Sequence, residues 1–160
     1  MWDLANGLWR RRSNTPLPHR LGDILGCGLA EFKTNDKIDK GKNRLYRILV
    51  SETAYLIWKM RNERRIRDGD TPGHEQQERE IRNRWTHALN KRLTIDRALT
   101  NDIKFGKRAL SEKTVIKTWH GCLDNENELP PDWHKLKGVL VGIFSSRPPG
   151  RDRQGLAETG

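Results

Sequence analysis

Residues 51–67 read SETAYLIWKMRNERRIR, and this stretch decides the fold. Its first half is apolar and aromatic, and its second half is a dense run of arginines. Apolar residues recur just upstream, at Leu45, Ile48 and Leu49, with the spacing of one helix face. We therefore expect one long helix over about 42–67, buried at one end and electropositive at the other.

Three further helices are expected around the long one. Trp2 and Leu8 have helical spacing in a segment that ends near the arginines at 10–12, and a second helix is indicated over about 74–93. Ser111 is a good cap for a third. The apolar residues 138–144 form either a short strand or an extended segment, and one strand cannot make a sheet. The fold class is therefore mainly α: a small helical bundle of about four helices with long loops.

The length of 160 residues favours one domain. We expect a single helical domain over residues 1–144. Residues 145–160 contain Arg, Pro, Gly and Ser with little to bury, which predicts a disordered basic tail. Only Met1 precedes the first apolar residue of the N-terminal helix, which suggests a fragment of a longer polyprotein.

The charge balance points to a polyanionic partner. Lys and Arg number 31 against 21 Asp and Glu, a formal net charge of +10. Such a surface attracts nucleic acid or an anionic membrane, although a solvated basic surface with no partner is the alternative. No signal peptide is visible, and no apolar run approaches the roughly 20 residues that span a bilayer. We expect an intracellular protein, nuclear or cytoplasmic, without a membrane partner.

Catalytic and metal-binding patterns are incomplete. The carboxylates are scattered among basic residues, and Glu52 stands out only because it lies near an apolar face, where pairing with an arginine is expected. Only His120 and Cys122 are near neighbours among possible zinc ligands, and Cys122 fits a core position. The sequence therefore predicts no catalytic residue, no metal site and no cofactor, and it favours a binding protein over an enzyme.

Clusters of cations are the positive signal for function. We expect nucleic-acid phosphates to bind the end of the long helix and two further basic segments. The residues are Lys59, Arg61, Arg64, Arg65, Arg67, Arg82, Lys104, Lys107 and Arg108. Cations at a helix C-terminus also suit the helix dipole, which is a structural reason for the same pattern. Trp58 and Trp85 can stack on bases, but core packing is the favoured interpretation for both.

Several motifs, taken in order along the chain, carry a family resemblance. They are LGCGLA at 25–30, RLYRIL at 44–49, SETAYLIWKMRNER at 51–64, NRWTHALNKRLTID at 83–96, GKRAL at 106–110, LPPDW at 129–133 and GVLVGI at 138–143. This set resembles the C-terminal region of fungal LINE-type (non-LTR) retrotransposon reverse transcriptases, downstream of their zinc-binding module. The Trp-Lys-x-Arg-Asn element at 58–62 is the part shared most widely in that family.

The departures from that family decide the expected mechanism. The polymerase Tyr-x-Asp-Asp motif and the Cys/His cluster of the zinc module are absent from this chain, and no ligand role falls on Cys27. The resemblance implies a non-catalytic nucleic-acid-binding helical module that binds RNA or DNA. The alternative is a structural or protein-interaction domain that self-associates or packs on other domains, through apolar surface on the N-terminal helix at Trp2 and Trp9.

Overall fold

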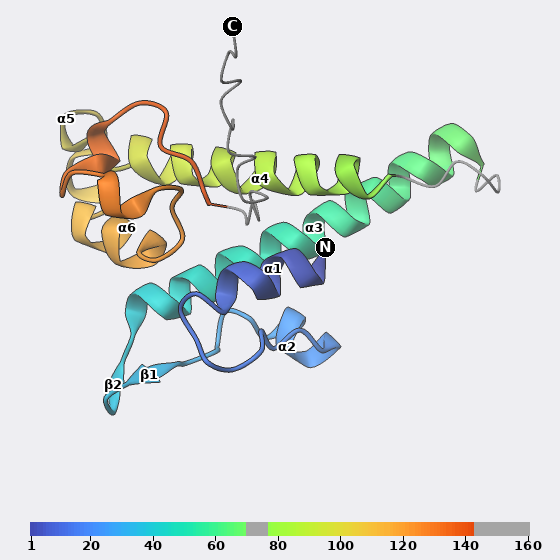
Figure 1. Ribbon diagram of the computed structural model, residues 1–160, viewed down its shortest axis with the longest axis horizontal. Coiled ribbons are helices and arrows are strands. Elements are labelled where there is room, and N and C mark those ends of the chain that lie inside the picture. The colour runs from blue at the N-terminus through green and yellow to red at the C-terminus, as the bar shows by residue number, and fades with distance from the viewer. Residues whose placement is uncertain (70–76, 143–160) are drawn as a thin grey trace, which may run out of the picture.

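The computed structural model describes residues 1–69 and 77–142, and this part of the chain is mainly helical (Figure 1). The α-helices are α1 (Trp2–Trp9), α2 (Leu21–Leu25), α3 (Lys40–Asp68), α4 (Glu78–Ala98), α5 (Asp102–Phe105) and α6 (Glu112–Trp119). Short 3-10 helices follow at η1 (Gly106–Arg108), η2 (Glu126–Glu128) and η3 (Trp133–Lys135). The strands β1 (Lys33–Thr34) and β2 (Lys37–Ile38) form a small antiparallel hairpin before α3.

The long helix α3 is the axis of the fold. Its 29 residues span about 43 Å, and α4 runs back beside it in the opposite direction (Figure 1). α1 packs along α3, while α6 packs against the N-terminal half of α3 and also touches α4. The core lies between these four helices because each directs its apolar residues inward.

Aromatic and leucine side chains fill this core. On α3 the buried apolar residues recur at helical spacing, and on α4 Trp85, Leu89 and Leu93 do the same. Trp9 of α1 contacts the rings of Phe32 and Tyr46 edge to face, which fastens the N-terminal segment to α3. The remaining core residues include Leu8, Leu17, Leu45, Leu49, Val115 and Trp119.

The first turn of α3 is fixed from two sides. The Asp39 side chain caps the helix by accepting a hydrogen bond from the Lys42 N–H at 2.9 Å. Burial tends to raise the Asp39 pKa, but this bond and the nearby Arg12 outweigh burial and lower it. At Gly41 the backbone comes so close to α6 that a Cβ atom would lie 2.5 Å from the Lys117 carbonyl oxygen. Only glycine permits this contact.

The mainly-α prediction is confirmed, and the long helix expected over 42–67 is observed at Lys40–Asp68. The described residues hold six α-helices rather than about four, because the short α2 and α5 add to the four longer helices. Within the described residues 138–142, Val141 makes one isolated bridge with Leu123 and no strand of greater length is present. The expected tail at 145–160 lies outside the described residues. No helix in the described ranges is long and apolar enough to cross a membrane.

The apolar surface expected on the N-terminal helix is not exposed, and this expectation was wrong. Trp9 is completely buried. Trp2 is half-buried, and its ring is stacked on that of His19 with the ring centroids 5.2 Å apart. The apolar face of α1 covers α3 instead of facing solvent, because Ala5 and Leu8 join the core. The exposed apolar residues of the N-terminal region belong to α2 and the residues after it.

Candidate nucleic-acid interface

Four adjoining hollows follow α3 along its length. The largest, of about 710 Å³, lies between α3 and α4 and contains Tyr55, Lys59 and Lys91. Trp58 lines the next, of about 420 Å³, towards the C-terminus of α3. Two more, of about 410 and 660 Å³, continue towards Lys40. Neighbouring hollows share lining residues, so we treat them as one surface and call it the α3 groove.

Cations dominate the lining of the α3 groove. Eleven Lys and Arg residues line it: Arg12, Lys37, Lys40, Arg44, Arg47, Lys59, Arg84, Lys91, Arg92, Lys113 and Lys117. Only three carboxylates share the lining, those of Asp39, Glu52 and Glu63. The positive charge of the protein is thus concentrated along one groove about as long as α3, which suits a linear polyanion.

The spacing of polar residues on α3 builds one wall of the groove. Lys40, Arg44, Arg47, Ser51, Tyr55 and Trp58 follow each other at intervals of three or four residues. Such intervals keep side chains on one side of a helix. Leu45, Leu49 and Leu56 occupy the other side and are buried in the core.

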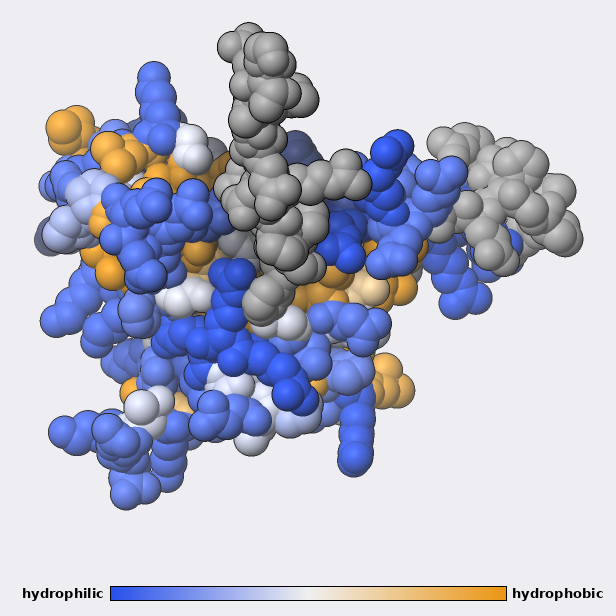
Figure 2. All heavy atoms as spheres, in the orientation of Figure 1, coloured by the Kyte–Doolittle hydropathy of each residue, from blue (hydrophilic) through white to orange (hydrophobic). Residues whose placement is uncertain are grey.

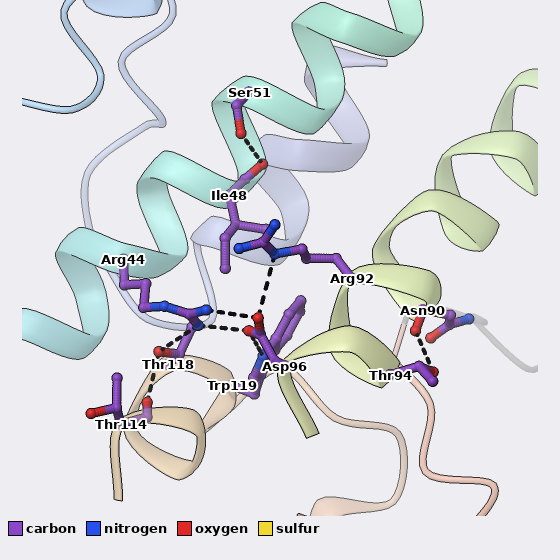
Figure 3. A network of polar contacts seen from close by, with 10 residues as sticks. All are labelled: Arg44, Ile48, Ser51, Asn90, Arg92, Thr94, Asp96, Thr114, Thr118 and Trp119. Atoms are coloured by element: carbon purple, nitrogen blue, oxygen red, sulfur yellow. Dashed lines mark hydrogen bonds and ion pairs between the residues drawn. The ribbon is translucent and has the colours of Figure 1, made fainter. Parts of the chain in front are cut away.

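A buried ionic network fixes the second wall (Figure 3). Asp96 of α4 is completely buried, and Arg44 of α3 donates to both of its carboxylate oxygens, at 2.6 and 2.7 Å. The Trp119 indole of α6 donates to the same carboxylate at 2.9 Å, and the Arg92 Nε atom lies 3.4 Å from it. Arg44 also donates to Thr118 at 3.3 Å. This network joins α3, α4 and α6 and holds two guanidinium groups at the groove.

Glu52 is the half-buried carboxylate of the groove. Burial raises its pKa, and the attraction of the nearby Arg92 partly offsets that rise. The carboxylate therefore weakens the positive potential of the groove only at pH values at which it is ionised.

Two exposed aromatic side chains, Tyr55 and Trp58, lie among the cations that line the groove. The rings of Tyr55 and Trp58 are stacked, with centroids 5.9 Å apart and planes inclined by 29°. Each residue is 59% exposed, so the expectation that Trp58 packs in the core was wrong. Trp85 does belong to the core, and its indole N–H donates to the buried Thr53 hydroxyl at 2.9 Å.

The predicted residues on α3 do not share one surface. Lys59 lines the groove, and Arg65 lies about two turns after Trp58 on the same side of the helix. Arg64 follows Tyr55 by about two and a half turns, which places it on the opposite side. Arg61 follows Trp58 by three residues and lies near its side of the helix, but it does not line the groove. The side chain of Arg67 falls outside the described part of the protein.

The other predicted cations lie apart from the groove. Arg82 is near the start of α4 and pairs with Glu78 at 3.4 Å. Lys104 in α5, with Lys107 and Arg108 in η1, lies beyond the opposite end of α4 (Figure 1). α4 has 21 residues and is about 30 Å long, so these clusters are too far apart to converge. The groove also brings together Lys40, Arg47, Lys113 and Lys117, which no pattern in the sequence singled out.

The structure offers little to nucleophilic or metal chemistry. Among the described residues, no group of three or more His, Cys, Asp or Glu side chains is arranged to hold a metal ion. Cys122 is completely buried, as expected of a core thiol, and burial raises its pKa to about 12.

Hydrophilic side chains cover most of the face shown in Figure 2, and hydrophobic ones gather near α5 and α6.

No protein family, no curated protein and no solved structure matches this chain. The α3 groove is therefore the main feature of the molecule that bears on function.

Proposed function

We propose that this protein is a non-catalytic nucleic-acid-binding module and that the α3 groove is its binding surface. The observation that carries the proposal is the excess of eleven Lys and Arg residues over three carboxylates along one groove. Phosphate contacts from such cations provide sequence-independent affinity that decreases with salt. The resemblance to the C-terminal region of LINE-type reverse transcriptases agrees with this proposal and stays a prediction.

The test is a salt titration of binding with a matched pair of charge-reversal variants. The groove variant combines Lys40→Glu, Lys59→Glu and Lys91→Glu, all at exposed positions in the groove. The control combines Lys104→Glu, Lys107→Glu and Arg108→Glu, which changes net charge equally at exposed positions that do not line the groove. Fluorescence anisotropy of labelled RNA and DNA strands measures affinity at each salt concentration.

The groove variant should bind more weakly and flatten the slope of log affinity against log salt by about two units, because three phosphate contacts are lost. The control should keep most of the slope. Equal weakening by both variants would indicate a diffuse effect of net charge and contradict the assignment to the groove. No binding of any nucleic acid at low salt would remove the function itself.

A second candidate is a protein-interaction domain, favoured by an apolar ridge at α2. Leu21, Leu25 and Leu29 are 73, 79 and 87% exposed and follow each other at intervals of four residues. Exposed apolar surface of this kind promotes association. Sedimentation velocity over a wide concentration range, with Leu25→Gln as the variant, tests it. A monomer at every concentration would count against self-association through this ridge.

A further inference from the structure

Trp58 is unlike the other tryptophans of this protein. Trp9, Trp85, Trp119 and Trp133 are buried, and Trp2 is half-buried, whereas Trp58 is 59% exposed beside an equally exposed Tyr55. A large aromatic ring left in water gives up much of the stabilisation that its burial would bring. The fold therefore does not explain why two such rings stand together on α3.

The two rings stack on each other at the wall of the groove, and each stays 59% exposed. They lie one helical turn apart with centroids 5.9 Å apart and an inclination of 29°. Tyr55 lines the 710 Å³ hollow and Trp58 the adjoining 420 Å³ hollow, while Lys59 lines both. A planar ligand stacked on the exposed part of either ring would thus lie in a hollow that Lys59 also lines.

The charge of the surroundings decides between two kinds of occupant. An apolar helix of a partner protein would also cover exposed aromatic rings. However, the hollow around Tyr55 continues to Lys91 and Arg92 on α4, and from there to the cations around Lys40. Arg92 already lies beside Asp96, but an apolar helix would offer no counterpart to the exposed amines of Lys40 and Lys91, whereas a nucleic-acid strand supplies one phosphate for each base.

We propose that Tyr55 and Trp58 stack on unpaired bases, so that the α3 groove selects single-stranded over double-stranded nucleic acid. This inference rests on the proposed nucleic-acid-binding function. In a duplex each base is covered by its neighbours, but in a single strand the faces of the bases are free to stack on aromatic side chains. Each stacked base is expected to raise affinity by about 5- to 100-fold.

Three ligands separate base stacking from phosphate attraction. They are a single strand of about 12 nucleotides, an abasic strand with the same length and backbone, and a duplex of the same sequence. A strand of this length is within the usual range of single-strand binding sites. Affinities are measured by anisotropy at one fixed salt concentration. The wild-type protein should bind the base-bearing strand at least about fivefold more tightly than the abasic strand.

Variants assign that preference to the aromatic pair. Tyr55→Ala combined with Trp58→Ala should lower affinity for the base-bearing strand by about 5- to 100-fold while binding of the abasic strand and the duplex stays unchanged. Trp58→Phe keeps an aromatic ring and should keep most of the preference. Ile103→Ala is the control for lost apolar surface, because Ile103 is 95% exposed in α5, outside the groove.

The outcomes distinguish the inference from the proposed function. Equal binding of base-bearing and abasic strands by the wild-type protein would overturn the stacking role and leave phosphate binding intact, and this comparison needs no variant. Equal weakening of all three ligands by the double variant would overturn it as well. Binding of none of the ligands at low salt would reject the proposed function, and the inference with it.

Discussion

The two halves of α3 are held in different ways. In the N-terminal half, Arg44 pairs with the buried Asp96, Gly41 touches the backbone of α6, and Thr53 accepts a hydrogen bond from Trp85. The C-terminal half exposes Tyr55 and Trp58 and makes its ion pairs near the surface, as Glu63 does with Arg84.

This difference separates a half of α3 that is fixed by buried polar contacts from a half that leaves two aromatic rings exposed. Because α3 is one continuous helix, the contacts of its N-terminal half also set the direction in which its C-terminal half points. Substitutions of the buried contacts in the first half should therefore act on stability, and substitutions of the exposed aromatic pair in the second half on binding. The following predictions compare the two halves.

The largest loss of stability is expected from Asp96→Ala. This variant leaves the Arg44 guanidinium without the carboxylate that it pairs with and removes the acceptor of the Trp119 indole. Breaking a buried ion pair from one side costs about 3–5 kcal/mol. Glu63→Ala, in the other half, breaks a half-exposed pair and should cost about 1 kcal/mol or less. Urea denaturation measures both, and equal losses would contradict the comparison.

A smaller loss is expected from Gly41→Ala. The new methyl group would lie 2.5 Å from the Lys117 carbonyl oxygen and 2.8 Å from its carbon, so α6 has to move away from α3. Overpacking of this kind costs about 1–3 kcal/mol. Gly22→Ala in α2 is the matched control, since nothing lies within 4 Å of its Cβ position. The control should be neutral or stabilising by up to about 1 kcal/mol. A stable Gly41→Ala protein would show that α6 is not pressed against this turn.

The helices were predictable because their apolar residues repeat at helical spacing over long segments. Leu45, Leu49 and Leu56 are enough to place α3, and its observed ends lie within two residues of the expected ones. The orientation of Trp58 could also have been inferred. It lies midway between the buried Leu56 and Met60, and therefore on the opposite side of the helix from both.

The groove could not be predicted in the same way. Its cations come from segments as distant as Lys40, Lys91 and Lys113, and only tertiary packing brings them to one surface. Asp96 follows Leu89 and Leu93 at core spacing, which marks it as a buried carboxylate. With 31 Lys and Arg residues in the chain, nothing in the sequence identifies Arg44 as its partner.

A third prediction uses pH to compare two carboxylates. Burial raises the Glu52 pKa, so the folded state binds this proton more tightly, and stability falls as pH rises from the unfolded value of about 4.3 through the raised one. Glu52→Gln should therefore gain stability relative to wild type between pH 4 and pH 7. The pKa of Asp39 is lowered despite its burial, so Asp39→Asn should lose relative stability over its own titration range. Denaturation at several pH values measures the stability of each variant relative to wild type. If both variants gained, or both lost, relative stability as pH rises, the opposite pKa shifts of Glu52 and Asp39 would be contradicted.

The smallest effect on stability is expected from Tyr55→Gln combined with Trp58→Gln. Both rings are 59% exposed, and glutamine is a good helix former, so the free energy of unfolding should change by no more than about 0.5 kcal/mol. Trp85→Phe, on the buried side of the same helix pair, loses the hydrogen bond to Thr53 and should cost more than 1 kcal/mol. Thermal melts followed by circular dichroism compare the two. A large loss of stability from the exposed pair would mean that Tyr55 and Trp58 stabilise the fold. Their exposure would then no longer be a reason to assign them to ligand binding.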